Sequence, residues 1–163
     1  MKKTSIYPIV FLSLIFALFV RAFFVSVYKI PTDSMAPMIM AGDYILASQV
    51  SYGLHFPWSQ EVWFRSKPHK GDLVACYFKS KPSFTYLRRV VAVEGETILN
   101  TKGEKIVLGP GQFYVVSDNP EFKEDSNEFG PIEVEQIESK AQLIWFSLSS
   151  EKQVRWNRLL KNL

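Results

Sequence analysis

Polar and apolar positions divide the chain into one long apolar run and a series of short segments after it. No charged residue occurs from Ile6 to Val20, and apolar residues continue past Arg21 as far as Tyr28. A helix needs about 20 apolar residues to cross the hydrocarbon layer. The run reaches that length if Arg21 extends to the far interface, as a long side chain near a helix end can do. This pattern predicts a transmembrane anchor over residues 6–28.

The residues around the apolar run indicate its orientation. Lys2 and Lys3 precede it and favour a cytoplasmic N-terminus, residues 1–5, because positive charge is enriched in cytoplasmic segments. A cleaved signal peptide is the alternative interpretation, since it also has a basic start and an apolar centre. No small-x-small cleavage site follows, and Ala22-Phe23-Phe24 places bulky rings where small residues are needed. We therefore expect an uncleaved single-pass anchor, with residues 29–163 outside the cytoplasm.

Short segments rich in aromatic and β-branched residues follow the anchor, bounded by turn signals. Asn100-Thr101-Lys102-Gly103 lies between two of them and predicts a hairpin. The expected strands are Tyr44–Ala47, Asp72–Phe78, Phe84–Val93, Glu96–Leu99, Lys105–Leu108 and Gln112–Val116. Their spacing predicts a mainly β domain with Greek-key or barrel connections. Val154–Leu160 is too short for a second span and is predicted to be a small amphipathic tail.

The stretch from Tyr52 to Lys70 departs from this pattern. Four large aromatic residues occur there among prolines and basic residues: Phe56, Trp58, Trp63 and Phe64. One interpretation is packing within the core or a loop. The other is a position at the lipid headgroups, where Trp and Tyr are enriched.

Composition narrows the possible functions. The 163 residues suffice for one domain with a core, and the net charge of +3 is too small and dispersed to indicate nucleic-acid binding. The single cysteine, Cys76, rules out an internal disulfide and lies in a segment predicted to be a buried strand. His55 and His69 are expected on the surface. We expect no metal site and no organic cofactor.

The segment Ile30–Met38 holds Ser34 between Pro31 and Pro37. Proline fixes its own φ and favours extended geometry in the residue before it. The segment is therefore expected to be a stiff turn that presents Ser34 at a fixed angle. Spacing alone favours an ordinary surface serine, although a nucleophile needs the same rigid support.

This segment resembles the nucleophile segment of bacterial type I signal peptidases, whose pattern is Pro-Ser-x-Ser-Met-x-Pro-Thr-Leu. The resemblance places Ser34 at the nucleophile and Met35 and Pro37 at the flanking positions. It places Thr32 at the position of a hydroxyl residue that helps to form the oxyanion hole together with the nucleophile, Ser34. Met38-Ile39 stands where the family pattern has Thr-Leu. Later blocks resemble other segments of the family: Ala41–Leu46, Val50–Gly53, Lys70–Val74, Tyr86–Glu96, Val116–Asn119 and Asp125–Gly130. These blocks add Asp118, Asp125 and Ser126 as substrate-binding or structural residues.

The resemblance implies a Ser-Lys endopeptidase of the bacterial cytoplasmic membrane, anchored in the lipid bilayer. Such an enzyme removes signal peptides from exported preproteins after small-x-small sites, outside the cytoplasm. A serine hydroxyl is a poor nucleophile until a base takes its proton. In this family the base is a neutral lysine, whose pKa falls from about 10.4 when apolar side chains bury it.

Arg88 stands at that lysine position, in Tyr86-Leu87-Arg88-Arg89. Arginine stays protonated, with a pKa of roughly 12.5 or above, so it stabilises an oxyanion but does not act as a general base. Lys123 falls where the family has a serine that hydrogen-bonds the lysine, so it is a candidate relocated base. The alternative is a solvated lysine in a charged loop. Asn127 replaces an arginine of the family, which leaves Asp125 without its usual partner and makes Arg88 a candidate partner.

Two alternative functions compete with the peptidase. A non-catalytic relative would bind export substrates or assist assembly of secreted structures. Arg88 favours this alternative, whereas Ser34 and Thr32 favour the enzyme. A self-cleaving Ser-Lys switch of the repressor type needs a DNA-binding segment where the apolar run stands, so we set it aside.

Overall fold

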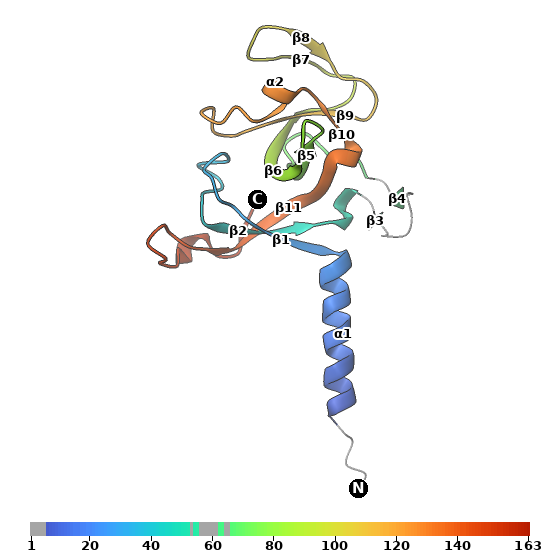
Figure 1. The fold of residues 1–163 in the computed structure, drawn as a ribbon, viewed down its shortest axis with the longest axis vertical. Coiled ribbons are helices and arrows are strands. Elements are labelled where there is room, and N and C mark those ends of the chain that lie inside the picture. Colours follow the sequence, from blue (N-terminus) through green and yellow to red (C-terminus); the bar gives the residue numbers. More distant parts are fainter. Residues whose placement is uncertain (1–5, 53, 56–61, 64–65) are drawn as a thin grey trace.

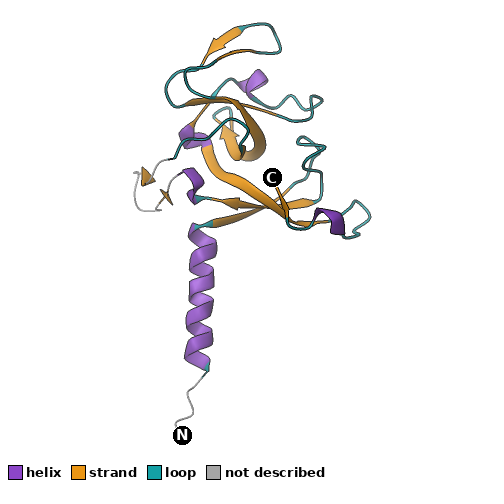
Figure 2. Ribbon diagram, turned by 180° about the vertical axis from the view of Figure 1, so that it is seen from behind, coloured by secondary structure: helices purple, strands orange, loops and turns teal. Residues whose placement is uncertain are grey.

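The computed structural model describes residues 6–52, 54–55, 62–63 and 66–163. It consists of a long N-terminal helix and a domain built mainly of strands (Figures 1 and 2). The helices are α1 (Tyr7–Phe23) and α2 (Ser126–Phe129), with 3₁₀ turns at Val50–Tyr52, Val134–Gln136 and Trp156–Arg158. The strands are β1 (Val25–Lys29), β2 (Asp43–Ser48), β3 (Leu54–His55), β4 (Val62–Trp63), β5 (Leu73–Phe78), β6 (Lys81–Ala92), β7 (Thr97–Leu99), β8 (Lys105–Val107), β9 (Gln112–Val116), β10 (Ile132–Glu133), β11 (Ile137–Ser147) and β12 (Lys161–Asn162).

The main sheet has eight strands and confirms the expected mainly β domain. Its order is β1, β2, β11, β5, β6, β9, β10, and β12 pairs with β11. These pairings are antiparallel. Because β11 pairs with both β2 and β5, a strand from late in the sequence joins the two halves of the sheet. The predicted hairpin is also present, with β7 and β8 paired so that Ile98 lies opposite Ile106.

Two long strands of the main sheet, β1 and β11, were not predicted from the sequence, and neither were the two-residue strands β3, β4, β10 and β12. The apolar run was expected to form an anchor as far as Tyr28, but the helix ends at Phe23. The following residues form β1, in which Val25 lies opposite Ser48 and Lys29 opposite Tyr44 of β2. The run therefore divides into a helix and an edge strand, because β2 offers backbone partners to the second part. The predicted amphipathic tail is instead a bridge and a 3₁₀ turn that lead to β12.

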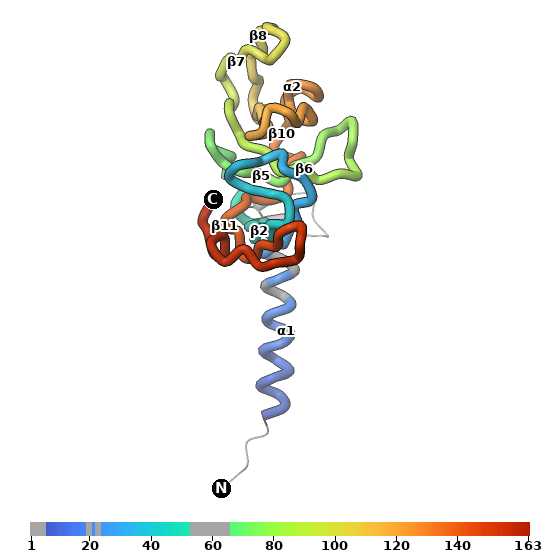
Figure 3. Tube along the Cα trace, turned by 90° about the vertical axis from the view of Figure 1, so that its left-hand side faces the viewer, coloured from blue at the N-terminus to red at the C-terminus, as the bar shows by residue number. Residues whose placement is uncertain are grey.

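Helix α1 projects from one end of the β domain, and α2, β7 and β8 lie at the other end (Figures 1 and 3). Its apolar side chains are exposed, with Phe11, Leu12 and Phe16 each about two-thirds accessible. Among the described residues, none of the helices combines the length and apolar character that a membrane crossing requires. The aromatic residues Phe56, Trp58 and Phe64 lie outside the described residues.

Three clusters of buried side chains form the core, and one of them contains residues next to Ser34. Met35 and Ile39 are fully buried against Ile45, Leu73 and Ile144. Full burial of one such side chain contributes about 1.5–3 kcal/mol. The residues that flank Ser34 are thus anchored in the core, which fixes the serine relative to the sheet. Cys76 is fully buried in another cluster, as the sequence predicted.

Candidate active site

Residues 30–42 form the loop between β1 and β2 that carries Ser34, called here the serine loop. Backbone bonds close its base, because Ile30 N donates to Asp43 O at 2.9 Å and Gly42 N donates to Ile30 O at 2.8 Å. Within the loop, Ala41 N donates to Asp33 Oδ1 at 2.7 Å. The loop is a compact turn, as its two prolines predicted.

Ser34 is 6% exposed, and its hydroxyl oxygen meets two donors. Arg88 Nη1 donates to Ser34 Oγ at 3.1 Å, and Thr32 Oγ1 approaches the same atom at 3.4 Å. The three side chains line one pocket of about 370 Å³. Its apolar lining includes Ile30, Ala75, Phe84 and Leu87. The structure therefore brings together the predicted nucleophile, the predicted oxyanion hydroxyl and the residue at the family's lysine position.

Arg88 extends from β6 and is only 3% exposed. Nη1 also donates to Leu87 O at 2.6 Å, and Nε and Nη2 donate to Glu124 O at 2.9 and 2.7 Å. The Tyr86 ring centre lies 5.2 Å from the guanidinium carbon. Burial lowers the pKa of Arg88 from its usual value, but arginine remains protonated at ordinary pH. The side chain is thus a fixed cation, held by carbonyl oxygens beside Ser34.

The segment after β9 holds the serine loop from its other side. Asn119 N donates to Ser34 O at 3.0 Å, and Asn119 Nδ2 donates to Asp33 O at 3.1 Å. Next to it, Asp118 accepts from Arg89 Nε at 2.8 Å and Nη2 at 2.5 Å. Asp118 was predicted as a site residue, whereas Asn119 was missed. Asn119 could have been predicted from the sequence, because it follows Asp118 in the block that resembles the family.

Asp125 supports the adjacent loop rather than the cation. Its Oδ1 accepts from Asn127 N at 2.8 Å and caps α2, while Oδ2 accepts from Ser117 N at 3.0 Å. The hypothesis that Arg88 binds this carboxylate is not what the structure shows, because the guanidinium bonds to Glu124 O instead. Arg88 thus bonds to the backbone of the residue before Asp125, while the Asp125 carboxylate bonds to backbone amides of its own loop and of Ser117.

Met35, Pro37 and Ser126 complete the predicted set. Met35 is buried in the core, and Pro37 is exposed on the serine loop after a cis peptide bond. Ser126 is buried, and its Oγ accepts from Val115 N at 3.0 Å. Met35 and Ser126 therefore act on the site through the support that they give to neighbouring segments.

Lys123 does not lie in the pocket that contains Ser34. It is exposed and lines a neighbouring pocket of about 610 Å³, together with Ser117 and Asp125. Phe122 is shared by the linings of the two pockets, which makes it a wall between them. The structure thus does not bring the candidate relocated base together with the serine.

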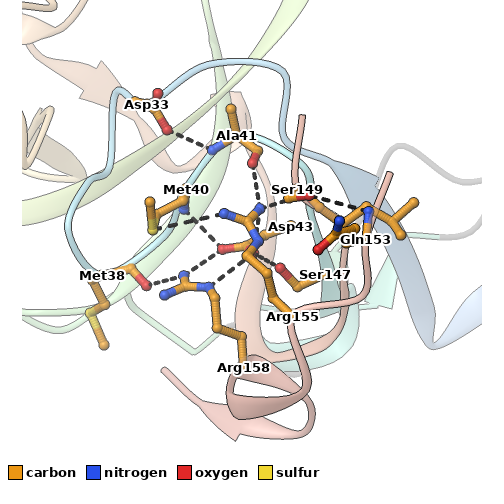
Figure 4. Close-up of polar contacts among 11 residues, drawn as sticks. Asp33, Met38, Met40, Ala41, Asp43, Ser147, Ser149, Gln153, Arg155 and Arg158 are labelled. Carbon is orange, nitrogen blue, oxygen red and sulfur yellow. Dashed lines mark hydrogen bonds and ion pairs between the residues drawn. The ribbon is translucent and has the colours of Figure 1, made fainter. Parts of the chain in front are cut away.

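A buried carboxylate ties the base of the serine loop to the C-terminal segment (Figure 4). Asp43 is fully buried, and Arg158 Nη2 lies 2.6 Å from its Oδ2. Asp43 Oδ1 accepts from Arg158 Nε at 3.1 Å and from Ser147 Oγ at 2.6 Å. Arg158 Nη2 also donates to Met38 O at 2.8 Å. One guanidinium therefore fixes both the loop and the strand that follows it.

Arg155 makes a second link between the same segments. Its Nη2 donates to Ala41 O at 2.5 Å and to Leu148 O at 2.7 Å. Gly42 lies between these contacts with φ of +89°, and a Cβ there would lie 2.0 Å from Leu148 O. Only glycine permits this conformation and close approach together. Neither arginine contact could be predicted from the sequence.

Comparisons with known proteins identify one family. The family described as Signal peptidase, peptidase S26 matches residues 3–109. Signal peptidase I of Pseudomonas aeruginosa is 32% identical over 105 residues, which cover 64% of this chain and 36% of the relative. Signal peptidase I of Buchnera aphidicola subsp. Baizongia pistaciae is 34% identical over 108 residues, covering 65% and 34%. Probable signal peptidase I-1 of Synechocystis is 26% identical over 174 residues, covering 93% and 84%.

The mainly β domain and its serine-bearing pocket agree with the class of protein that these matches define. The chain belongs to the signal peptidase family, peptidase S26. This confirms the resemblance drawn from the motifs. The chain spans about a third of the length of the Pseudomonas and Buchnera relatives that it matches.

Proposed function

We propose that this chain is a serine endopeptidase that removes signal peptides from exported preproteins after small-x-small sites. Ser34 is the nucleophile, and Thr32 donates to the oxyanion that forms on the scissile carbonyl. The observation that carries the proposal is the single pocket in which Ser34, Thr32 and Arg88 meet. Family membership and the names of the relatives support the same reaction.

The strands beside the pocket support an extended peptide substrate. Tyr28 and Lys29 of β1 line one part of the pocket, and Phe84 and Thr85 of β6 line another. β6 pairs with β9 only from Arg89 onwards, so its earlier residues have one backbone edge without a strand partner in the described part of the chain. A peptide that adds to such an edge gains backbone hydrogen bonds, while its side chains enter pockets on alternate sides. The apolar lining beside Ser34 suits small side chains.

The exposed apolar surface of α1 supports a membrane anchor within the same proposal. The 17-residue helix is about 25 Å long at 1.5 Å per residue, which is shorter than the roughly 30 Å hydrocarbon layer by an amount that local thinning of the bilayer can accommodate. Among its described side chains, Ile9, Leu14 and Leu18 are more than half exposed. We propose that α1 anchors the chain in the bacterial cytoplasmic membrane, with residues 1–5 in the cytoplasm and the β domain outside. Closure of the sheet into a Greek-key barrel belongs to the same proposal.

Cleavage of a preprotein tests the enzymatic function. The full chain in detergent micelles is expected to cut a preprotein after its small-x-small site, at a bond that mass spectrometry of the products identifies. Ser34→Ala is expected to abolish cleavage without a change in thermal unfolding. Ser150→Ala is the matched control, because Ser150 is exposed and away from the pocket. Equal cleavage by Ser34→Ala would reject Ser34 as the nucleophile.

A non-catalytic substrate-binding protein is the second candidate function, because a buried arginine stands where the family has its base. This candidate predicts that the native chain binds the preprotein but leaves it intact. Binding of a fluorescent preprotein, measured beside cleavage, separates the two functions. Binding without cleavage at any pH from neutral to strongly alkaline would favour the second candidate.

Protease accessibility tests the topology. Protease added to intact spheroplasts is expected to degrade the domain after Lys29 and to leave α1 protected by the membrane. An epitope at residues 1–5 should become accessible only after the membrane is permeabilised. Full protection of the β domain would contradict the proposed orientation.

A further inference from the structure

The hydroxyl of Ser34 is surrounded by donors. Arg88 Nη1 donates to its oxygen at 3.1 Å, and Thr32 Oγ1 lies 3.4 Å away. The Thr32 hydroxyl can accept as well as donate; apart from it, the hydrogen bonds of the described residues give the Ser34 proton no acceptor. A hydroxyl oxygen that receives hydrogen bonds from a cation is a weaker nucleophile while protonated, but its alkoxide is stabilised. Lys29 and Lys81 line the same pocket, but neither forms a hydrogen bond with Ser34 among the described contacts, and Lys81 Nζ binds the Glu124 carboxylate at 2.8 Å. The local geometry therefore favours the deprotonated serine without a base bonded to it.

No carboxylate of the described residues neutralises the positive charge of Arg88, which lies beside Ser34. Its other hydrogen bonds go to the neutral carbonyls of Leu87 and Glu124. The ionisable groups around the guanidinium are Cys76 on the neighbouring strand β5, Tyr86 on β6 itself, and Glu124 and Asp125 in the loop before α2. The Glu124 carboxylate binds Lys81 at 2.8 Å, and the Asp125 carboxylate binds backbone amides. Arg88 thus forms no ion pair with a carboxylate of the described residues.

We propose that Arg88 is a catalytic residue that stabilises the Ser34 alkoxide, and that hydroxide from the solvent removes the serine proton. The inference rests on the proposed function, and it adds a mechanism that works without a general base on the protein. It also makes ambient pH the regulator of the site. Two observations carry it: the buried guanidinium bonded to Ser34 Oγ, and the position of Lys123 in a different pocket.

The reaction balances with water and hydroxide as the only co-reactants. Hydroxide takes the Ser34 proton and becomes water, and the alkoxide forms a bond to the scissile carbonyl carbon. The carbon–nitrogen bond then breaks, and the leaving amine takes a proton from water, which regenerates hydroxide. A hydroxide attacks the resulting ester, the bond to Ser34 Oγ breaks, and the products are a carboxylate and the Ser34 hydroxyl.

This mechanism predicts a distinctive dependence on pH. Below the pKa of Ser34, the alkoxide fraction rises about tenfold per pH unit, so the rate constant rises with the same slope. A lysine base gives a different profile, which levels off above the pKa of that lysine. The slope therefore distinguishes a cation-stabilised alkoxide from a side-chain base.

Covalent labelling of Ser34 tests the inference independently of peptide cleavage. A fluorophosphonate probe reacts when the serine oxygen bonds to phosphorus and fluoride leaves, and mass spectrometry locates the adduct. The full chain in detergent is labelled across a series of pH values, beside Arg88→Gln, Arg88→Lys and Lys79→Gln. Lys79 is the matched control, because it is a surface cation paired with Glu133.

We expect labelling of the native chain to rise about tenfold per pH unit without levelling off near neutral pH. Arg88→Gln should be labelled about 10²-fold more slowly at each pH, as for loss of a donor to an oxyanion. Arg88→Lys should give a profile that levels off, because a buried lysine titrates. Lys79→Gln should match the native chain. Thermal unfolding shows whether each variant is folded.

Two results would overturn the inference. One is a native profile that levels off near neutral pH, which would reveal a base. The other is labelling of folded Arg88→Gln at the native rate. If labelling follows the expected pattern but no preprotein is cut, the proposed function fails while the role of Arg88 stands. If preprotein is cut with a profile that levels off near neutral pH, the function stands and this mechanism fails.

Discussion

Arg158 and Met38 are 120 residues apart in the sequence, yet Arg158 Nη2 donates to Met38 O at 2.8 Å. The same guanidinium pairs with the buried carboxylate of Asp43. The C-terminal segment therefore holds the serine loop in place without contributing to the pocket that contains Ser34. This separation allows the stability of the loop and the chemistry of the site to be tested by different substitutions.

Replacement of Arg158 by alanine is expected to destabilise the domain strongly. It removes the closest cation and two hydrogen bonds from the buried Asp43 carboxylate, and leaves Arg155 Nη2, 3.5 Å from Oδ1, as the remaining ion pair. Breaking a buried ion pair costs up to about 3–5 kcal/mol. Urea unfolding followed by tryptophan fluorescence measures the loss. Lys161→Ala, which removes an exposed cation nearby, serves as the control. A loss below about 1 kcal/mol would show that the pair does not support the fold.

The Asp43 carboxylate predicts sensitivity to acid. Burial by itself raises the pKa of Asp43, but the bonds from Arg158, Met40 N and Ser147 outweigh it, so the pKa lies below the ordinary 3.8. A lowered pKa in the folded state adds stability that is complete above the unfolded pKa and is lost as pH falls through the folded pKa. Unfolding measured from pH 6 downwards should therefore show a loss of stability that begins near pH 4. In Asp43→Asn this contribution should disappear, whereas an unchanged pH dependence would assign it to other carboxylates.

Thr32→Ala is expected to lower preprotein cleavage about 10²- to 10³-fold if its hydroxyl donates to the oxyanion. Thr32→Ser keeps the hydroxyl and should be mild. The effect should appear in kcat, because the bond strengthens only in the transition state. Thr101→Ala is a suitable control, since Thr101 is an exposed hydroxyl outside the Ser34 pocket. Native kcat in Thr32→Ala would remove Thr32 from the site.

Lys123→Ala separates the relocated-base hypothesis from the alkoxide mechanism. The hypothesis drawn from the sequence requires this variant to lose activity. The exposed position of Lys123 in a different pocket leads us to expect cleavage within about twofold of the native rate and an unchanged pH profile. Kinetics of the native chain and the variant, measured in parallel, decide the matter. Loss of activity in folded Lys123→Ala would restore the lysine as a base.

The sequence predicted those strands that carry a local signal. β5, β9 and the β7–β8 hairpin have clear turn residues and apolar content, and they occur close to the expected residues. β11 was missed because Ser139 and Ala141, which point inward near its start, carry little apolar signal, and because a bulge between Ala141 and Leu143 breaks the alternation that identifies a strand. β1 was missed because its apolar residues continue those of the helix, and only its pairing with β2 sets it apart.

In the site, too, residues that belong to short sequence motifs were predicted, whereas contacts between residues far apart in the sequence were not. Motifs in the sequence identified Ser34, Thr32 and Arg88, and the structure places them together. The links from Arg155 and Arg158 to the serine loop could not be predicted, because each joins residues more than 100 positions apart. The sequence also gave no means to separate Lys123 from Ser34, since that depends on how the loop before α2 folds around Phe122.

The place of β11 at the centre of the sheet has a consequence for the order of synthesis. β2 pairs with β11, and the serine loop is held by Arg155 and Arg158, which follow β11 in the chain. A ribosome therefore completes Ser34, Thr32 and Arg88 long before it makes the residues that fix their geometry. Because distant pairings form slowly, the nascent domain spends this interval without an assembled site. The geometry of the site is thus complete only after β11 and the two arginines have been made, well after the N-terminal helix.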